Sequence, residues 1–231
     1  MKFASRRQGK ARSCTRVGRG FGLALIMLAL TPALARSQPD LILTVKVYDY
    51  AEVPSRTLAA AEAEAQRILK AAGVDAVWLD CLEPPGRLAS GANQDCAGTF
   101  GGATVVLRIL PNSTPAQATF SDTVFGFTCG TALASVFYSR VTDFVHDLHG
   151  YDSEVPVLLG DAITHELGHL LLGPDSHSPT GIMCAHWDEK YLRQALMARQ
   201  FFSSRQSAAL RANLLRLQKE TNRAATADPQ P

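Results

Sequence analysis

The segment His165–His169 reads His-Glu-Leu-Gly-His, with two histidines four residues apart and Glu166 directly after the first. A four-residue step is just over one helical turn, so both imidazoles project from one face and can hold a single zinc ion. Glu166 stands beside them as a candidate general base for hydrolysis. In a chain of 231 residues with 6 histidines, chance yields about 0.005 such patterns. The pattern predicts one catalytic Zn²⁺ ion.

Two residues after this segment are candidates for a third zinc ligand. His177 would supply another imidazole, and Asp175 would supply a carboxylate, which zinc also accepts. Three neutral imidazoles leave the ion its full charge, which favours the activation of water. We therefore expect His177 as the ligand, with Asp175 as the alternative.

The element that carries these residues is predicted to be a helix over Pro156–Leu172. Proline fits the first turn of a helix, and Gly173-Pro174 is a typical end signal. Several apolar residues can pack inward from this helix: Leu158, Ala162, Leu167, Leu170 and Leu171. Asp161, one turn before His165, is a candidate for orienting a ligand imidazole.

The chain before the helix favours an α/β (α+β) fold. Leu41–Val47 alternates apolar with other residues, as a strand does. Pro54-Ser55 then opens a helical pattern that closes at Gly73, and Val74–Leu79 is a second strand. A strand, a helix and a strand this close together predict a right-handed crossover with parallel strands.

Further strands and loops are expected in the middle of the chain. Glu83–Gly102 is rich in proline and glycine and is predicted to be a loop, followed by a strand over Ala103–Leu110. Ser121–Cys129 is loop-like, and Leu133–Arg140 is predicted to be an edge strand that could pair with an extended peptide.

Two helices are expected at the C-terminal end. The first follows residue 187 and runs to about Phe202. The second begins at Ser203, which forms a capping-box pattern with Gln206. We expect a disordered tail over residues 221–231.

The N-terminal segment predicts export. Residues 1–35 place an uncharged apolar run, Phe21–Ala35, after a basic stretch, and Pro32 interrupts it. This is typical of a signal peptide, and the run is short for a membrane span of about 20 residues. We expect a signal peptide over 1–35, a catalytic domain over 36–220, no membrane anchor after cleavage, and a secreted or periplasmic bacterial protein. The general and the twin-arginine export routes both remain open.

The exported part contains four cysteines, an even number that predicts two disulfides in an oxidising compartment. Three pairings are possible. The short, Pro- and Gly-rich loop between Cys81 and Cys96 favours that pair, which leaves Cys129 with Cys184.

The net charge of the chain indicates which classes of binding partner are unfavourable. Residues 1–35 hold seven basic residues and no acidic one, and the remaining 16 basic and 21 acidic residues give a charge of −5. An acidic body without a run of lysine and arginine argues against nucleic acid and anionic membranes as partners.

The stretch His165–Met183, HELGHLLLGPDSHSPTGIM, resembles the metzincin zinc peptidases, and within them the matrix-metalloproteinase-like branch. The resemblance implies a mixed twisted sheet with an active-site helix and C-terminal helices. It also implies zinc held by His165 and His169, Glu166 as general base, and Met183 in a turn beneath the metal. Peptides or proteins are the implied substrates, and the chain is expected to be a monomer. The third ligand differs in spacing, since His177 stands two residues later than in the family pattern.

Two other interpretations remain open. A gluzincin-type peptidase would take its third ligand, Glu189, from the following helix. A non-catalytic binding module would use zinc only structurally, although such a site has no use for Glu166.

A hydrolytic site also needs a second group that stabilises the developing oxyanion. The candidates are His186, Tyr191, Tyr151 and His149. His146 and His149 lie three residues apart and are expected at the surface.

Overall fold

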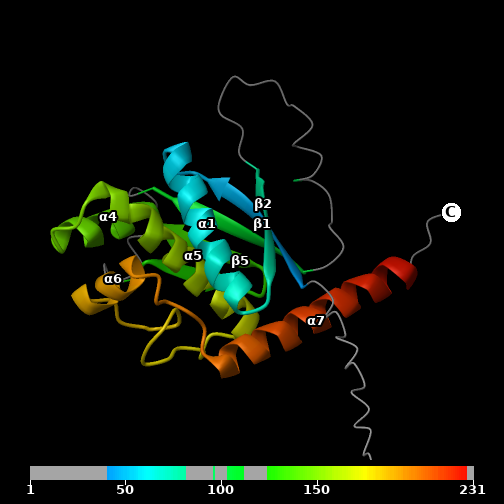
Figure 1. Cartoon of the computed structure of the whole chain (residues 1–231). Coiled ribbons are helices and arrows are strands. Elements are labelled where there is room, and N and C mark those ends of the chain that lie inside the picture. The colour runs from blue at the N-terminus through cyan, green and yellow to red at the C-terminus, as the bar shows by residue number, and fades with distance from the viewer. Residues whose placement is uncertain (1–40, 82–95, 97–102, 112–123, 228–231) are drawn as a thin grey trace, which may run out of the picture. The chain divides into compact units, whose positions relative to one another are not determined.

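The structure is a computed structural model that describes residues 41–81, 96, 103–111 and 124–227 (Figure 1). These residues all belong to one compact unit, Pro39–Pro231. The predicted signal peptide and most of the predicted loop Glu83–Gly102 lie outside the described residues. Within the described ranges, no helix has the length and apolar character needed to cross a membrane.

Five strands form one mixed sheet. They are β1 (Ile42–Asp49), β2 (Asp75–Asp80), β3 (Ala103–Leu110), β4 (Gly126–Cys129) and β5 (Leu133–Phe137). Their order is β2-β1-β3-β5-β4, with β4 antiparallel to β5 and every other neighbouring pair parallel. The parallel pairing of β1 with β2 confirms the predicted crossover, and the sheet with its helices confirms the α/β (α+β) class.

In the part of the chain that the structure describes, five α-helices of eight or more residues accompany the sheet, with one short 3-10 turn, η1 (Asp152–Glu154). They are α1 (Ser55–Ala71), α4 (Tyr138–Asp147), α5 (Val155–Leu172), α6 (Glu189–Leu196) and α7 (Ser204–Ala227). Helices α1 and α5 pack side by side against one face of the sheet (Figure 1). Apolar side chains of β1, β3, α1 and α5 are fully buried between these layers, among them Leu43, Val45, Leu107, Ile68, Leu158 and Ile163.

The region 124–147 differs from the sequence prediction. The expected edge strand Leu133–Arg140 ends at Phe137, where α4 begins, and it pairs on both sides within the sheet. Aromatic and β-branched residues favour a strand locally, but α4 buries Val141 and Val145 against the core, and this packing overrides the local preference. The edge strand beside β5 is β4, inside the segment that we expected to be a loop.

The C-terminal helices also differ in extent. Helix α6 ends at Leu196, earlier than the expected Phe202. The predicted capping box before α7 is confirmed by two hydrogen bonds. Ser203 Oγ accepts from the backbone N–H of Gln206 at 3.2 Å, and Gln206 Oε1 accepts from the backbone N–H of Ser203 at 2.9 Å. Helix α7 continues to Ala227, so residues 221–227 of the expected tail are helical.

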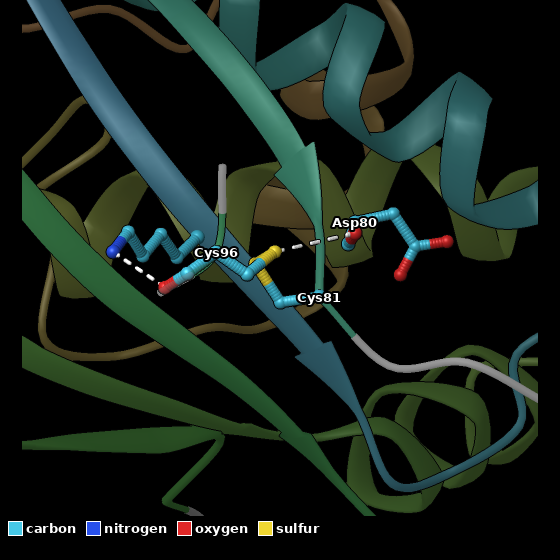
Figure 2. Close-up of a disulfide and its surroundings, with 4 residues drawn as sticks. Asp80, Cys81 and Cys96 are labelled. Atoms are coloured by element: carbon cyan, nitrogen blue, oxygen red, sulfur yellow. Dashed lines mark hydrogen bonds between the residues drawn. A yellow bond between two sulfur atoms is a disulfide. The ribbon is translucent and has the colours of Figure 1, made fainter. Parts of the chain in front are cut away.

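One of the two expected disulfides is present, between Cys81 at the end of β2 and Cys96 (Figure 2). Lys46 of β1 donates a hydrogen bond to the Cys96 carbonyl at 2.8 Å. Together these contacts attach Cys96 to the sheet.

The prediction of a second disulfide, between Cys129 and Cys184, is wrong, because both cysteines are free. Side chains of a strand alternate between the two faces of a sheet. Gly126 faces α5, as its contact with Glu166 shows, so Cys129, three residues later, faces away from α5. The Cys184 thiol instead contacts the His186 carbonyl at 3.2 Å.

A titratable group of α1 gives a prediction for the stability of this fold. Burial, and secondarily the charge of Asp80, raises the pKa of Glu62 to about 7 from 4.5. Between about pH 4.5 and about pH 7, the Glu62 carboxyl is therefore protonated in the folded state and ionised in the unfolded state. Its contribution to the free energy of unfolding is fully present below about pH 4.5 and falls as the pH rises through about 7.

We expect Glu62→Gln to match the wild type in melting temperature near pH 4.5 and to exceed it by a few °C, on the order of 3 °C, at pH 8. Thermal unfolding at both pH values measures this difference. Glu52→Gln, at an exposed position, controls for the loss of one charge. An equal difference between Glu62→Gln and the wild type at both pH values would contradict the linkage.

Candidate metal centre

Helix α5 positions the two histidines and the glutamate of the predicted site. Pro156 lies in its first turn, and the helix is buried over most of its length. It ends at Gly173, whose φ of +98° is strained for residues with a side chain. Pro174 and Asp175 then form a turn that brings His177 back towards the helix.

Three imidazoles converge at this point. The Nε2 atom of His169 lies 3.1 Å from Nε2 of His165 and 3.1 Å from Nε2 of His177. Two nitrogen ligands of one tetrahedral zinc ion, each at about 2.0–2.1 Å, lie roughly 3.3 Å apart. The spacing of the three nitrogen atoms therefore fits one small cation.

The other nitrogen of each helical histidine fixes which tautomer it adopts. His165 Nδ1 donates to the carbonyl of Ile182 at 2.8 Å. His169 Nδ1 lies 3.3 Å from the Gly173 carbonyl and 3.1 Å from Ser176 Oγ, which itself donates to that carbonyl at 2.7 Å. The Nε2 atoms of His165 and His169 then present lone pairs, which can bind one cation between them.

Burial keeps the two imidazoles of α5 neutral. It lowers the pKa of His165 to about 4 and also lowers the pKa of His169. Neutral imidazole is the form that binds a metal ion. The donor set, its tautomers and its charge state thus fit zinc.

His177, and not Asp175, is the third group at this point. Within the described ranges, the one cluster of potential ligands with three or more members consists of His165, His169 and His177. Asp175 is exposed on the turn after α5 and does not belong to this cluster. Glu189, the alternative from the next helix, forms an ion pair with Arg193 on the exposed side of α6.

The segment after His177 passes beneath these histidines. The Ser178 amide donates to the Met183 carbonyl at 2.8 Å, and the Ile182 amide donates to the Phe201 carbonyl at 3.1 Å. Met183 is fully buried against Gly168, where an added Cβ would overlap its sulfur atom. The glycine between the two helical histidines thus allows Met183 to pack directly under them.

Glu166 lies in the wall of a cavity of about 270 Å³ beside the three imidazoles. The cavity is lined by Val124, Phe125, Gly126, Phe127, Thr128, Ala162, His165, Glu166, His169, Pro174, His177, Cys184, Ala185 and Trp187. Burial raises the pKa of the Glu166 carboxyl to about 8. A divalent cation at the imidazoles would oppose this rise by favouring the carboxylate.

One wall of the cavity is aromatic. Trp187 stacks on Phe125 with ring centroids 4.6 Å apart and on Tyr191 at 4.3 Å, and Phe144 meets Phe125 edge to face at 5.1 Å. The Trp187 indole donates to the Cys184 carbonyl at 3.2 Å, which holds this ring in place. The cavity therefore combines a polar metal-binding end with an apolar wall.

The predicted oxyanion groups are not part of this cavity. Tyr191 is buried beneath Trp187, while His186 and Tyr151 are exposed elsewhere. His149 follows the C-terminal end of α4, and His146 Nε2 forms a hydrogen bond with the Asp152 carboxyl at 2.7 Å. All of these residues are described, and none of them lines the cavity.

Asp161 does not orient a ligand imidazole, because His165 Nδ1 is already bonded to a backbone carbonyl. Asp161 is fully buried and interacts with Tyr191, Glu64 and Arg67. Burial, reinforced by the charge of Glu64, raises the pKa of Asp161 well above its usual value.

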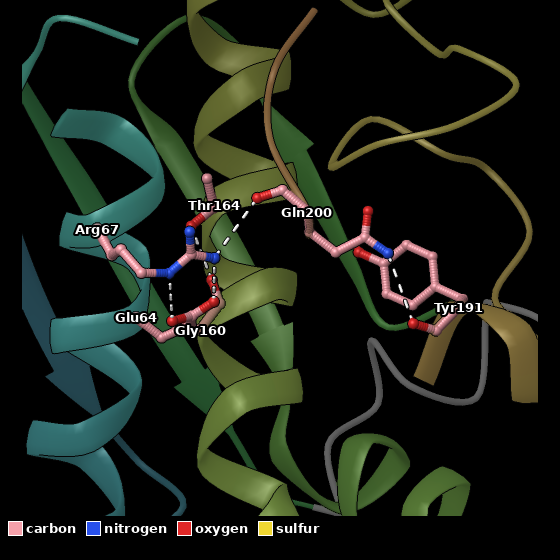
Figure 3. Close-up of polar contacts among 6 residues, drawn as sticks. All are labelled: Glu64, Arg67, Gly160, Thr164, Tyr191 and Gln200. Carbon is pink, nitrogen blue, oxygen red and sulfur yellow. Dashed lines mark hydrogen bonds and ion pairs between the residues drawn. The ribbon is translucent and has the colours of Figure 1, made fainter. Parts of the chain in front are cut away.

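A polar cluster lies between α1, α5 and α6, and Figure 3 shows its members Glu64, Arg67, Tyr191 and Gln200. Arg67 donates to the Glu64 carboxylate at 2.8 and 2.6 Å and lies 3.5 Å from the Gln200 carbonyl. Gln200 Nε2 lies 3.5 Å from the Tyr191 carbonyl. This cluster links the helices behind the metal centre.

Strand β4 contributes to the cavity although the sequence predicts a loop there. Gly126 and Thr128 lie on the strand that borders the cavity, and Phe125 precedes it. The alternation of Phe125 and Phe127 around Gly126 is the one local signal for a strand there.

No protein-family model and no curated protein matches the chain. Two solved structures are similar to it. The archaemetzincin of Methanopyrus kandleri is 21% identical, with a TM-score of 0.44, covering 79% of this chain and 99% of its own. A zinc-dependent peptidase of Methanocorpusculum labreanum (strain Z) is 16% identical, with a TM-score of 0.45, covering 73% of this chain and 99% of its own. Both likenesses are distant.

Proposed function

We propose that the chain is a secreted zinc-dependent endopeptidase of the metzincin type. The observation that carries this proposal is the convergence of three imidazole nitrogens next to a buried glutamate in an open cavity. A purely structural zinc site is closed by four protein ligands, whereas a catalytic site keeps a position open. Three imidazoles beside Glu166 correspond to the catalytic kind.

His165, His169 and His177 would hold the zinc ion, and their Nδ1 partners would keep the first two rings oriented. When bound, zinc supplies Lewis-acid chemistry for the hydrolysis of a peptide carbonyl. Glu166 takes a proton from the attacking water and passes it to the leaving amine.

The sheet edge supports a peptide as the substrate. Among the described strands, none pairs with the outer edge of β4, which borders the cavity. An extended peptide can add to such an edge through main-chain hydrogen bonds. The aromatic wall made by Phe125 and Trp187 favours an apolar side chain of the substrate next to the scissile bond.

Export is proposed on two features. Residues 1–35 have the composition of a signal peptide. The Cys81–Cys96 disulfide is typical of an oxidising compartment. The compartment is therefore the bacterial periplasm or the medium.

Digestion of a mixed peptide library by the purified chain tests the function. The metal-stripped chain should leave the library intact, and added zinc should restore cleavage, mainly next to apolar residues. Mass spectrometry of the new termini measures both results. A zinc-loaded chain that cleaves nothing would instead support a non-catalytic zinc-binding module.

A further inference from the structure

Gly126, the first residue of β4, faces the side chain of Glu166 at very short range. A Cβ atom placed on Gly126 would lie 2.6 Å from Glu166 Cγ and 2.8 Å from Glu166 Cδ. Real Cβ atoms essentially never approach other atoms below 3.0 Å. The Glu166 side chain therefore occupies the space that any other residue at 126 would need.

Neither Gly126 nor Glu166 can move away from this contact without disturbing other contacts. On one side, β4 pairs with β5, where Gly126 lies opposite Val136. Directly before it, the Phe125 carbonyl accepts from the Phe137 amide at 2.8 Å and the Val124 carbonyl accepts from Arg140 at 2.7 Å.

On the other side, Glu166 belongs to the buried helix α5, whose neighbouring residue His165 is held by the Ile182 carbonyl. The glutamate is itself only 6% exposed. A side chain at position 126 would thus have to displace the Glu166 carboxyl or the strand.

We propose that Gly126 is a positioning residue. The space left open by its missing side chain, the Gly126 seat, accommodates the Glu166 side chain and so holds its carboxyl beside the three imidazoles. Gly126 touches no reacting atom and acts through Glu166. This role in catalysis rests on the proposed function, whereas the seat itself is a property of the metal-free chain.

A double-mutant cycle on the metal-stripped full chain tests the seat without reference to activity. Gly126→Ala should lower the melting temperature by about 5 °C. In the Glu166→Ala background, the same substitution should cost at most about half as much, because Cγ and Cδ of residue 166 are gone. The remaining cost reflects the Ser135 carbonyl oxygen, which the new Cβ would also approach at 2.6 Å.

Gly130→Ala is the matched control on the turn after β4. Nothing lies within 4 Å of an added Cβ there, although the φ of +63° makes any side chain unfavourable. Gly130→Ala should lower the melting temperature by the same amount in the wild-type and the Glu166→Ala backgrounds. Equal costs of Gly126→Ala in the two backgrounds would overturn the seat.

The catalytic part is read from the zinc-loaded chain. Gly126→Ala should lower kcat by about 10- to 100-fold, with zinc content unchanged and KM within about 3-fold, because only the position of the base has moved. An unchanged kcat would overturn the positioning role. Coupling to Glu166 in a chain that hydrolyses no peptide would overturn the proposed function and leave the seat intact.

If Gly126→Ala alone does not fold, the folding of the double variant with Glu166→Ala tests whether Glu166 is the residue that requires glycine at position 126. Folding of the double variant supports the seat, since the conflict then lies with Glu166. Failure of both variants overturns it, because the Ser135 carbonyl would then be the neighbour that requires glycine.

Discussion

Glu166→Gln is expected to retain one zinc ion per chain and the wild-type fold while peptide hydrolysis falls at least ~100-fold. The carboxyl lies in the cavity beside the imidazoles, but it does not belong to the cluster of three nitrogens that fits the metal. Glutamine fills the same volume and cannot accept the proton of the attacking water. Steady-state hydrolysis with metal analysis on the same sample gives both quantities.

The matched control for this variant is Glu189→Gln. Glu189 is exposed and paired with Arg193, so its replacement should leave both zinc content and hydrolysis unchanged. Loss of zinc in Glu189→Gln would support the gluzincin arrangement. Wild-type hydrolysis in Glu166→Gln would exclude Glu166 as the general base.

His177→Ala is expected to weaken zinc binding at least ~100-fold, since even residues that only support a ligand cost about 10- to 100-fold. Its Nε2 atom lies 3.1 Å from that of His169, so the substitution removes one of three converging donors. A competition titration against a chelator measures the affinity.

Asp175→Ala is the control for this variant, because Asp175 is exposed outside the cluster. It should keep nearly the wild-type affinity for zinc. The opposite pattern would make Asp175 the ligand, and equal losses would indicate that Asp175 supports His177 from outside the metal site.

The sequence predicts the helix of this site well, because helical periodicity is a local property. The spacing of His165 and His169 places both on one face of α5 whatever surrounds the helix. Proline in the first turn and Gly173 after the last mark its ends, and the structure confirms both. The strand-helix-strand start is equally local and is also confirmed.

The parts that the sequence does not predict depend on distant packing. Strand β4 has four residues and begins with glycine, so local propensity favours a loop, yet pairing with β5 makes it a strand at one edge of the sheet. The Cys129–Cys184 pair fails for a related reason. Cysteine parity carries no information about which face of a sheet a cysteine occupies, and the structure leaves both thiols free.

Titration of zinc into the metal-stripped chain, with bound zinc and peptide hydrolysis followed in the same samples, tests the central claim most directly. We predict that hydrolysis rises in proportion to bound zinc and stops rising at one ion per chain, because His165, His169 and His177 form a single cluster in the described chain. Hydrolysis in the absence of zinc, or zinc bound at one equivalent without hydrolysis, would contradict this account.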